Sequence, residues 1–112
     1  MKERFEVLFL EEVEEFLDEL DDKTREKIIY NVDKSRFFND PELFKKLNDT
    51  VWEFRTRFKS KQYRLLAFWD KRKKTDTLVI ATHGFVKKSQ KTPKKEIEKT
   101  EQIAKAYLAK QN

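Results

Sequence analysis

The chain has little of the chemistry that many proteins use at functional sites, since it contains no cysteine and one histidine. Without cysteine it has neither a disulfide framework nor a thiol nucleophile, and a lone histidine argues against a zinc site. It has no apolar run long enough to cross a membrane, and its acidic N-terminus lacks the basic and apolar regions of a signal peptide. We therefore expect a cytoplasmic protein that needs no metal or other cofactor and does not associate with membranes.

Charged and aromatic residues are abundant instead. Lys, Arg, Asp and Glu make up 42% of the 112 residues, and ten Phe, three Tyr and two Trp supply bulky side chains for a core. A chain of this length can bury roughly 65% of its unfolded surface. No linker or internal repeat divides it, so we expect a single folded domain over residues 1–112.

The two halves of the chain carry opposite charge. Residues 1–50 contain nine Lys and Arg against fifteen Asp and Glu, whereas residues 51–112 contain seventeen against six. Clustered basic residues in one part of a small domain are typical of nucleic-acid binding. The distribution therefore indicates a partner that carries phosphate groups.

Hydrophobic periodicity predicts an α+β fold. Alternating apolar and polar residues predict strands, and apolar residues at helical spacing predict helices. The expected strands are 4–9, 51–58, 62–69 and 76–85, and the expected helices are 10–20, 22–38 and 93–110, with a short helical piece at 40–46. The order β-α-α-β-β-β-α is typical of a mostly antiparallel sheet with helices packed on one face.

A lysine-rich stretch leads from the last expected strand into the last expected helix: His83-Gly84-Phe85-Val86-Lys87-Lys88-Ser89-Gln90-Lys91-Thr92-Pro93. Thr92 is a suitable N-cap, and Pro93 fits the first helical position. Gly84 is the only glycine and indicates a bulge or a close approach of the backbone. Lysines beside a helix N-terminus oppose the helix dipole, but together with free N–H groups they suit an anion such as phosphate.

Arginines of two neighbouring strands are expected to converge. Arg55 lies on the polar face of one strand and Arg64 lies in the next, so the two side chains meet if they share a face. The pattern leaves open whether Tyr63 or Arg64 points outward. Leu66 and Phe68 share the face of Arg64, so this strand is expected to be covered on both sides. The simpler interpretation is that such arginines only form the solvent-facing side of a half-buried sheet.

Three runs in this order carry a family resemblance: Val51-Trp52-Glu53-Phe54-Arg55, Tyr63-Arg64-Leu65-Leu66 and the stretch from His83 to Pro93. Over nearly its whole length the chain resembles the RelE/ParE superfamily of bacterial toxins, and most closely the phage-related HigB-like branch. The resemblance implies a RelE-like fold and a type II toxin–antitoxin toxin that cleaves mRNA in the ribosomal A site without a metal. In this reaction a ribose 2′-OH attacks the adjacent phosphate and leaves a 2′,3′-cyclic phosphate and a 5′-OH. The implied partners are the ribosome, mRNA and a HigA-like helix-turn-helix antitoxin.

The resemblance also suggests roles for individual residues. Arg55 and Arg64 would stabilise the charge that grows on the phosphate oxygens, and Lys87, Lys88 or His83 would transfer the proton. His83 is at least as well explained as a locally hydrogen-bonded residue inside a strand. The residues expected to contact the RNA backbone are Lys45, Lys46, Arg57, Lys59, Lys61, Lys91 and Lys94.

Two other functions stay open at this point. ParE proteins share the fold but poison DNA gyrase, and a non-catalytic RNA- or ribosome-binding module would need the same basic surface. The clustered cations favour RNA cleavage, because gyrase inhibition does not require a site centred on a phosphate.

Overall fold

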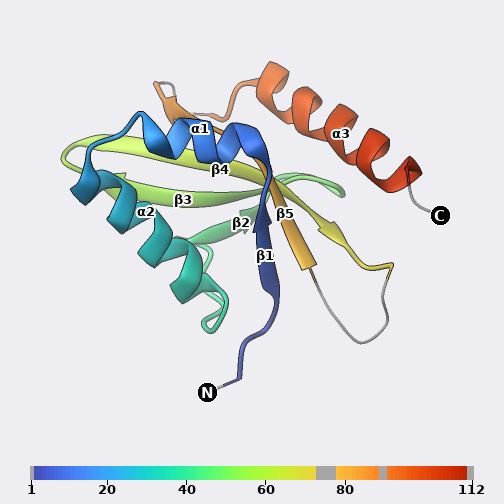
Figure 1. Cartoon of the computed structure of the whole chain (residues 1–112), viewed down its shortest axis with the longest axis horizontal. Helices are drawn as coiled ribbons and strands as arrows, with labels where there is room; N and C mark the ends of the chain where they lie inside the picture. The colour runs from blue at the N-terminus through green and yellow to red at the C-terminus, as the bar shows by residue number, and fades with distance from the viewer. Residues whose placement is uncertain (1, 73–77, 89–90, 111–112) are drawn as a thin grey trace.

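A computed structural model of the chain describes residues 2–72, 78–88 and 91–110. Within these residues the elements are β1 (Glu6–Phe9), α1 (Glu11–Asp18), α2 (Asp22–Ser35), β2 (Phe44–Lys46), β3 (Trp52–Phe58), β4 (Lys61–Asp70), β5 (Leu78–Lys87) and α3 (Lys94–Ala109). The strands form one sheet in the order β1-β5-β4-β3-β2, in which β1 runs parallel to β5 and the other pairs are antiparallel (Figure 1). The α+β class and the mostly antiparallel sheet are confirmed. Residues 76–77 of an expected strand and Ser89-Gln90 of the lysine-rich stretch lie outside the described residues.

Helices α1 and α2 cover one face of the sheet and bury the larger part of the core there. Val13 and Leu17 of α1 and Ile28 and Val32 of α2 are buried in this cluster. Asp21 caps α2, because its carboxylate accepts a hydrogen bond from the backbone N–H three residues further on (2.8 Å). The helical spacing of apolar residues therefore predicts correctly which side of each helix faces the sheet.

The segment 40–46 is a turn followed by a strand, so the short helical piece expected there is wrong. Asp40 starts a single turn, in which its backbone carbonyl accepts two hydrogen bonds from N–H groups further along (2.9 and 3.0 Å). The chain then extends as β2, because Phe44 is buried against the rings of Phe54 and Trp52, whose centroids lie 4.3 and 4.9 Å away. Burying this ring on the sheet outweighs helix propensity, which is a weak local preference.

Helix α3 packs on the face of the sheet opposite to α1 and α2. Successive side chains of a strand point to opposite faces. Leu65 and Ala67 of β4 belong to the core beneath α1 and α2, whereas Phe68 and Ile80 pack against Ala104 of α3. The expectation of helices on one face therefore holds for α1 and α2 and is corrected for α3, and β4 is buried on both sides.

Gly84 lies where α1 approaches β5 most closely. A Cβ atom added here would stand 2.4 Å from Cδ2 of Phe16 and 2.7 Å from Cδ2 of Leu65, well inside van der Waals contact. The backbone at Gly84 does not have a positive φ, so space rather than conformation requires the glycine. The close approach expected at this residue is confirmed.

Gly84→Ala is expected to lower the free energy of unfolding by about 1–3 kcal/mol, because the added methyl group overpacks the contact between α1 and the sheet. Urea unfolding measures the loss. The double variant Gly84→Ala/Phe16→Leu should recover part of it, since the smaller side chain leaves room for the methyl group. Unchanged stability of Gly84→Ala would contradict the close approach.

Candidate active site

Side chains of β3, β4 and β5, most of them polar, form rows across the sheet face on which α3 packs. Residues directly opposite each other on antiparallel strands share a face. The three rows are Arg57–Gln62–Lys87, Arg55–Arg64–Phe85 and Glu53–Leu66–His83. Tyr63 points to the other face and is buried in the core beneath α1 and α2, which settles the orientation of Arg64. The two arginines predicted to converge are therefore cross-strand neighbours.

A bulge in β5 turns His83 onto this face. Leu66 pairs with His83, but the residue after Leu66 pairs with Ala81, so Thr82 is the extra residue of β5. An inserted residue changes which side the following side chains face. The bulge indicated by the glycine thus exists, but it lies at Thr82.

Glu53 connects the two arginines. Its carboxylate is almost fully buried and lies 3.4 Å from Nε of Arg64 and 3.6 Å from Nε of Arg55. Arg64 is only 2% exposed, and its terminal nitrogens donate hydrogen bonds to Oε1 of Gln62 (2.7 Å) and to the carbonyl oxygen of Tyr63 (3.1 Å). The planar guanidinium is consequently held in one orientation.

Arg55 is the more accessible member of the pair, with 24% of its side chain exposed. It also donates a hydrogen bond to the carbonyl oxygen of Pro41 (3.2 Å). The Nε atoms of Arg55 and Arg64 are buried, and neither makes a hydrogen bond within the described residues. Two guanidinium groups thus share one carboxylate, Glu53, which leaves an excess of positive charge and unused donors. An anion such as a phosphate would balance the excess charge.

Thr92 ties the segment before α3 to this group. Its hydroxyl donates a hydrogen bond to Oε1 of Glu53 (2.7 Å). Pro93 is the N-cap of α3, without a side-chain cap, and the helix begins at Lys94. The predicted N-cap at Thr92 is therefore wrong, because the hydroxyl bonds to a carboxylate and hydrogen bonds to charged groups are the stronger ones.

An open groove borders the arginine pair next to the turn between β3 and β4. Its lining consists of Arg55, Ser60, Lys61, Gln62, Val86, Lys87 and Lys88. Burial lowers the pKa of Lys87, and the positive charges of Arg64, Arg55 and Lys45 lower it further, while Glu53 acts in the opposite direction. A lysine with a lowered pKa releases its proton more readily and is better suited to accept one during a reaction.

The basic residues predicted on β2 and β3 divide between the two faces of the sheet. Lys45 and Arg57 pair with residues of the arginine face, and both are exposed. Lys46 faces the other side, where its Nζ lies 4.0 Å from a carboxylate oxygen of Asp49. Of these three, Lys45 and Arg57 are placed to reach the same ligand as the arginine pair.

The remaining predicted RNA contacts flank the site at two loops. Lys59 and Ser60 form the turn between β3 and β4 with φ of 51° and 68°, the left-handed backbone that a two-residue hairpin turn requires. Lys61 follows the turn and lines the groove. Lys91 and Lys94 are exposed near the start of α3, and Lys94 forms an ion pair within the helix at 3.9 Å. Of these, Lys61 alone lines the groove.

His83 is buried with both ring nitrogens hydrogen-bonded. Nε2 lies 2.9 Å from Oε1 of Glu96, and Nδ1 lies 2.9 Å from Oγ1 of Thr82. Because a carboxylate only accepts, Nε2 carries a proton and Nδ1 is the acceptor in the neutral ring. Burial lowers the pKa of His83, which the hydrogen bond to Glu96 partly offsets. His83 thus links β5 to α3 and presents no free nitrogen to the groove.

The stability of the fold is expected to decrease as the pH falls below about 6.5, because of His83. The unfolded chain binds a proton at the ordinary histidine pKa of 6.5, whereas the native chain binds it only at lower pH, so protonation favours the unfolded state. Above both pKa values neither state is protonated and the effect disappears. Urea unfolding between about pH 5 and pH 8 measures the slope.

His83→Gln is the control for this pH dependence, since glutamine can still donate to Glu96 but does not titrate. Glu96, Lys99 and Glu12 act on the His83 charge and are identical in both chains. The difference between the two pH profiles therefore isolates His83. Parallel profiles would contradict the lowered pKa.

The structure adds Glu53, Gln62 and Phe85 to the residues considered for this site. Glu53 alternates with Arg55 along β3, and that spacing was a usable signal that the two share a face. Gln62 has the same relation to Arg64 on β4. Phe85 is half-buried in the arginine row, and its ring stacks on His83 with a centroid distance of 6.1 Å. Sequence gives no sign that a carboxylate would be buried between the arginines.

Among residues 2–72, 78–88 and 91–110, no three His, Cys, Asp or Glu side chains gather as a metal ion would require. None of the helices in this part of the chain is both long and apolar enough to cross a membrane.

A comparison with protein families finds one whose model matches residues 15–105: phage-derived protein Gp49-like (DUF891). The matched range runs from α1 into α3 and contains every residue assigned to the site above. A comparison with curated proteins finds no match.

Proposed function

Because the chain belongs to the phage-derived Gp49-like family, which is related to RelE- and HigB-like toxins of toxin–antitoxin systems, we propose that it is a toxin that cleaves mRNA on the ribosome. The proposal places it in the HigB-like branch, with a HigA-like antitoxin as its partner. One observation carries the proposal: Arg55 and Arg64 pair across β3 and β4 around the buried Glu53, with Lys87 beside them.

The proposed reaction transfers an RNA phosphate from one ribose oxygen to another. The 2′ oxygen loses its proton and forms a bond to phosphorus, the bond between phosphorus and the 5′ oxygen breaks, and the departing 5′ oxygen takes up a proton. The products are a 2′,3′-cyclic phosphate and a 5′-OH. Atoms and charge balance with a proton acceptor and a proton donor alone, so no cofactor enters the scheme.

Arg55 and Arg64 stabilise the phosphate oxygens as their negative charge increases. Groups that interact more strongly with the transition state than with the substrate accelerate the reaction. Glu53, Gln62 and Thr92 hold the arginines in place, so little reorganisation is needed when the charge develops. The excess positive charge of the group supports this role.

Lys87 accepts the proton from the 2′-OH, which its lowered pKa supports. Lys88 follows it at the end of β5, is exposed and lines the groove, where it is available to donate a proton to the 5′ oxygen. His83 supports the site by joining β5 to α3. In this scheme it is a positioning residue, because both of its ring nitrogens are already bonded.

The RNA backbone follows the groove between the turn after β3 and the arginine pair. Lys61 and Arg57 lie on one side and Lys45 on the other, and each contact to a phosphate adds affinity without sequence preference. Phe85 offers a half-exposed ring beside Arg64 on which a base can stack. Apart from Lys45, the basic residues named here all belong to residues 51–112, the basic half of the chain.

The proposal is tested by expressing the chain under tight control and mapping the 5′ ends of cellular mRNAs. We expect new ends that carry 5′-OH groups and follow the reading frame, because cleavage depends on translation. Lys87→Met should remove most of these ends, whereas Lys27→Met, the same change at a lysine on α2, should not. Growth arrest with DNA breaks and no such ends would favour gyrase inhibition instead, and growth without either would favour simple RNA binding.

A further inference from the structure

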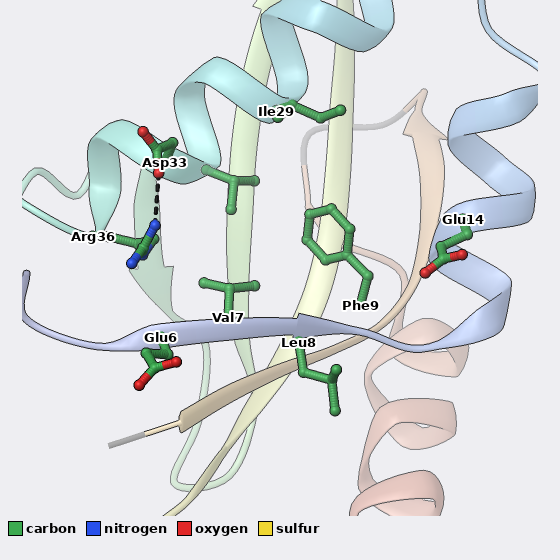
Figure 2. A pocket seen from close by; sticks show the side chains of 9 residues that line it. Glu6, Val7, Leu8, Phe9, Glu14, Ile29, Asp33 and Arg36 are labelled. Atoms are coloured by element: carbon green, nitrogen blue, oxygen red, sulfur yellow. Dashed lines mark hydrogen bonds and ion pairs between the residues drawn. The ribbon is translucent and has the colours of Figure 1, made fainter. Parts of the chain in front are cut away.

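A second groove lies between β1, α1 and α2. Val7 and Phe9 point from β1 towards α2, which carries Ile29 on the facing wall (Figure 2). Val32 of α2 also lines the groove. The groove has a volume of about 480 Å³ and shares no residue with the groove beside the arginine pair. Ile29 is 43% exposed although isoleucine is usually buried. The apolar surface is therefore open to a partner.

The rim of this groove is acidic. Glu6 and Glu14 are exposed on β1 and α1. Asp33 forms an ion pair with Arg36 (2.8 Å), which balances its negative charge. An acidic rim repels RNA and attracts lysine and arginine side chains. The charge thus selects a basic protein segment over a nucleic acid.

The edge of β1 offers backbone hydrogen bonds to such a segment. β1 is the terminal strand of the sheet, so within the described residues no strand pairs with its outer edge. The N–H of Leu10 donates to the carbonyl oxygen of Ala81 on β5 (3.0 Å). Successive peptide groups of a strand point to opposite edges, so the N–H and C=O groups of Val7 and Phe9 face away from β5, at the outer edge of the sheet.

Exposed apolar side chains flank this edge on both faces of the sheet. Leu8 points to the sheet face opposite to Val7 and Phe9 and is 41% exposed. Ile29 of α2 lies above the face to which Val7 and Phe9 point. A helix lying in the groove would cover Ile29 but leave Leu8 in water. A strand added beside β1 would cover both, because its alternate side chains reach both faces.

We propose that an extended segment of the antitoxin, with alternating apolar and basic residues, pairs with the outer edge of β1 and fills this groove. The inference rests on the proposed function, since it takes the antitoxin as the partner. The segment binds away from the arginine pair, so it holds the toxin without occupying the RNA groove directly. Main-chain bonds supply affinity, and the groove and its acidic rim supply specificity.

The test uses the purified protein encoded by the reading frame that adjoins the gene of this chain. Its affinity is measured by calorimetry for the unaltered chain and for two variants at one position, Val7→Pro and Val7→Ala. Proline removes the N–H at the outer edge of β1 and is tolerated on an edge strand, whereas alanine removes only side-chain contacts. We expect Val7→Pro to bind at least about tenfold more weakly than Val7→Ala.

Two further measurements complete the test. Glu14→Lys should weaken binding about tenfold, whereas Glu15→Lys, the same reversal beside the groove, should not. Hydrogen exchange of the unaltered complex should show new protection of the Val7 and Phe9 amides, which needs no variant to fold. Absence of that protection, or equal binding by Val7→Pro and Val7→Ala, would overturn strand pairing even if the charge reversal weakened binding.

The failure of this inference and the failure of the proposed function give different results. If the unaltered chain is not bound by the adjoining protein, the docking inference falls. Cleavage of mRNA by the chain alone is measured separately and does not depend on that partner. If the partner binds as expected but no mRNA is cut, the docking surface stands and the nuclease proposal falls.

Discussion

An Arg64→Lys chain is expected to cleave mRNA about 10²–10³-fold more slowly than the unaltered chain. Lysine keeps a positive charge beside Glu53, so the buried carboxylate stays partly compensated. It cannot reproduce the planar guanidinium that donates to Gln62 and to the Tyr63 carbonyl and that, in the proposed reaction, also holds the phosphate. The loss should appear in the rate at saturating substrate more than in the substrate concentration needed for half-maximal rate, because the interaction strengthens in the transition state.

Arg57→Lys is the matched control for this variant. Arg57 lies on the same face, in the next row of the sheet, and is exposed. The same chemical change there should alter the rate less than about tenfold, since an exposed arginine contributes mainly through charge. Circular dichroism and urea unfolding confirm that both chains are folded. Equal losses in the two variants would contradict a specific role for Arg64.

Glu53→Gln is expected to lower the free energy of unfolding by about 3–5 kcal/mol, the usual cost of leaving a buried charge without its partner. Arg64 is 2% exposed, and Glu53 is the carboxylate in contact with it. Neutralising Glu53 leaves two guanidinium groups facing each other across β3 and β4. Urea unfolding at neutral pH measures the loss, and cleavage should fall as well because the arginines lose their fixed geometry.

Two comparisons separate the charge of Glu53 from its hydrogen bonds. Thr92→Val removes the hydroxyl that donates to Glu53 and should cost only about 1 kcal/mol. Sulfate should stabilise Glu53→Gln more than the unaltered chain, because an anion can then bind between the unpaired arginines. A Glu53→Gln chain as stable as the unaltered one, with no added response to sulfate, would show that the carboxylate does not organise the pair.

Much of the fold could be predicted from the sequence, because the spacing of apolar residues in a helix or strand depends only on neighbouring residues. The apolar stripe of α1 and the alternation of β3 each depend on residues close together in the chain. The same alternation placed Arg55 on the face opposite to Phe54, which the structure confirms. The glycine at position 84 likewise predicted a close approach.

The features that the sequence did not predict depend on distant contacts. Phe44 belongs to a strand because the rings of Phe54 and Trp52 lie beside it. The sequence of residues 40–46 contains no information on where those two rings lie. Helix α3 packs on its face of the sheet because Phe68 and Ile80 point to that face. Periodicity alone could not show that these two residues belong to a different cluster from the main core. The hydroxyl of Thr92 donates to Glu53, a residue far away in the chain. Thr92 therefore does not cap α3, although the residues next to it predicted that role.

The candidate site shows the same division. Arginine and lysine types in the basic half indicated an anion site, and β-sheet geometry indicated that Arg55 and Arg64 could meet. The buried carboxylate between them is a property of the packed sheet, since it requires burial from both β4 and the segment before α3. The charge composition indicated an excess of basic residues. It did not indicate that the carboxylate of Glu53 would lie between Arg55 and Arg64 and hold them in place.

The most direct test of the account is the chemistry of the cut RNA ends. Purified chain is incubated with ribosomes translating a defined mRNA, and the fragments are analysed by mass spectrometry, with Arg64→Lys alongside. The account predicts 2′,3′-cyclic phosphates on the upstream fragments and 5′-OH groups on the downstream fragments, at rates that fall about 10²–10³-fold in Arg64→Lys. Intact mRNA with the unaltered chain, or fragments that carry 5′-phosphates, would contradict it.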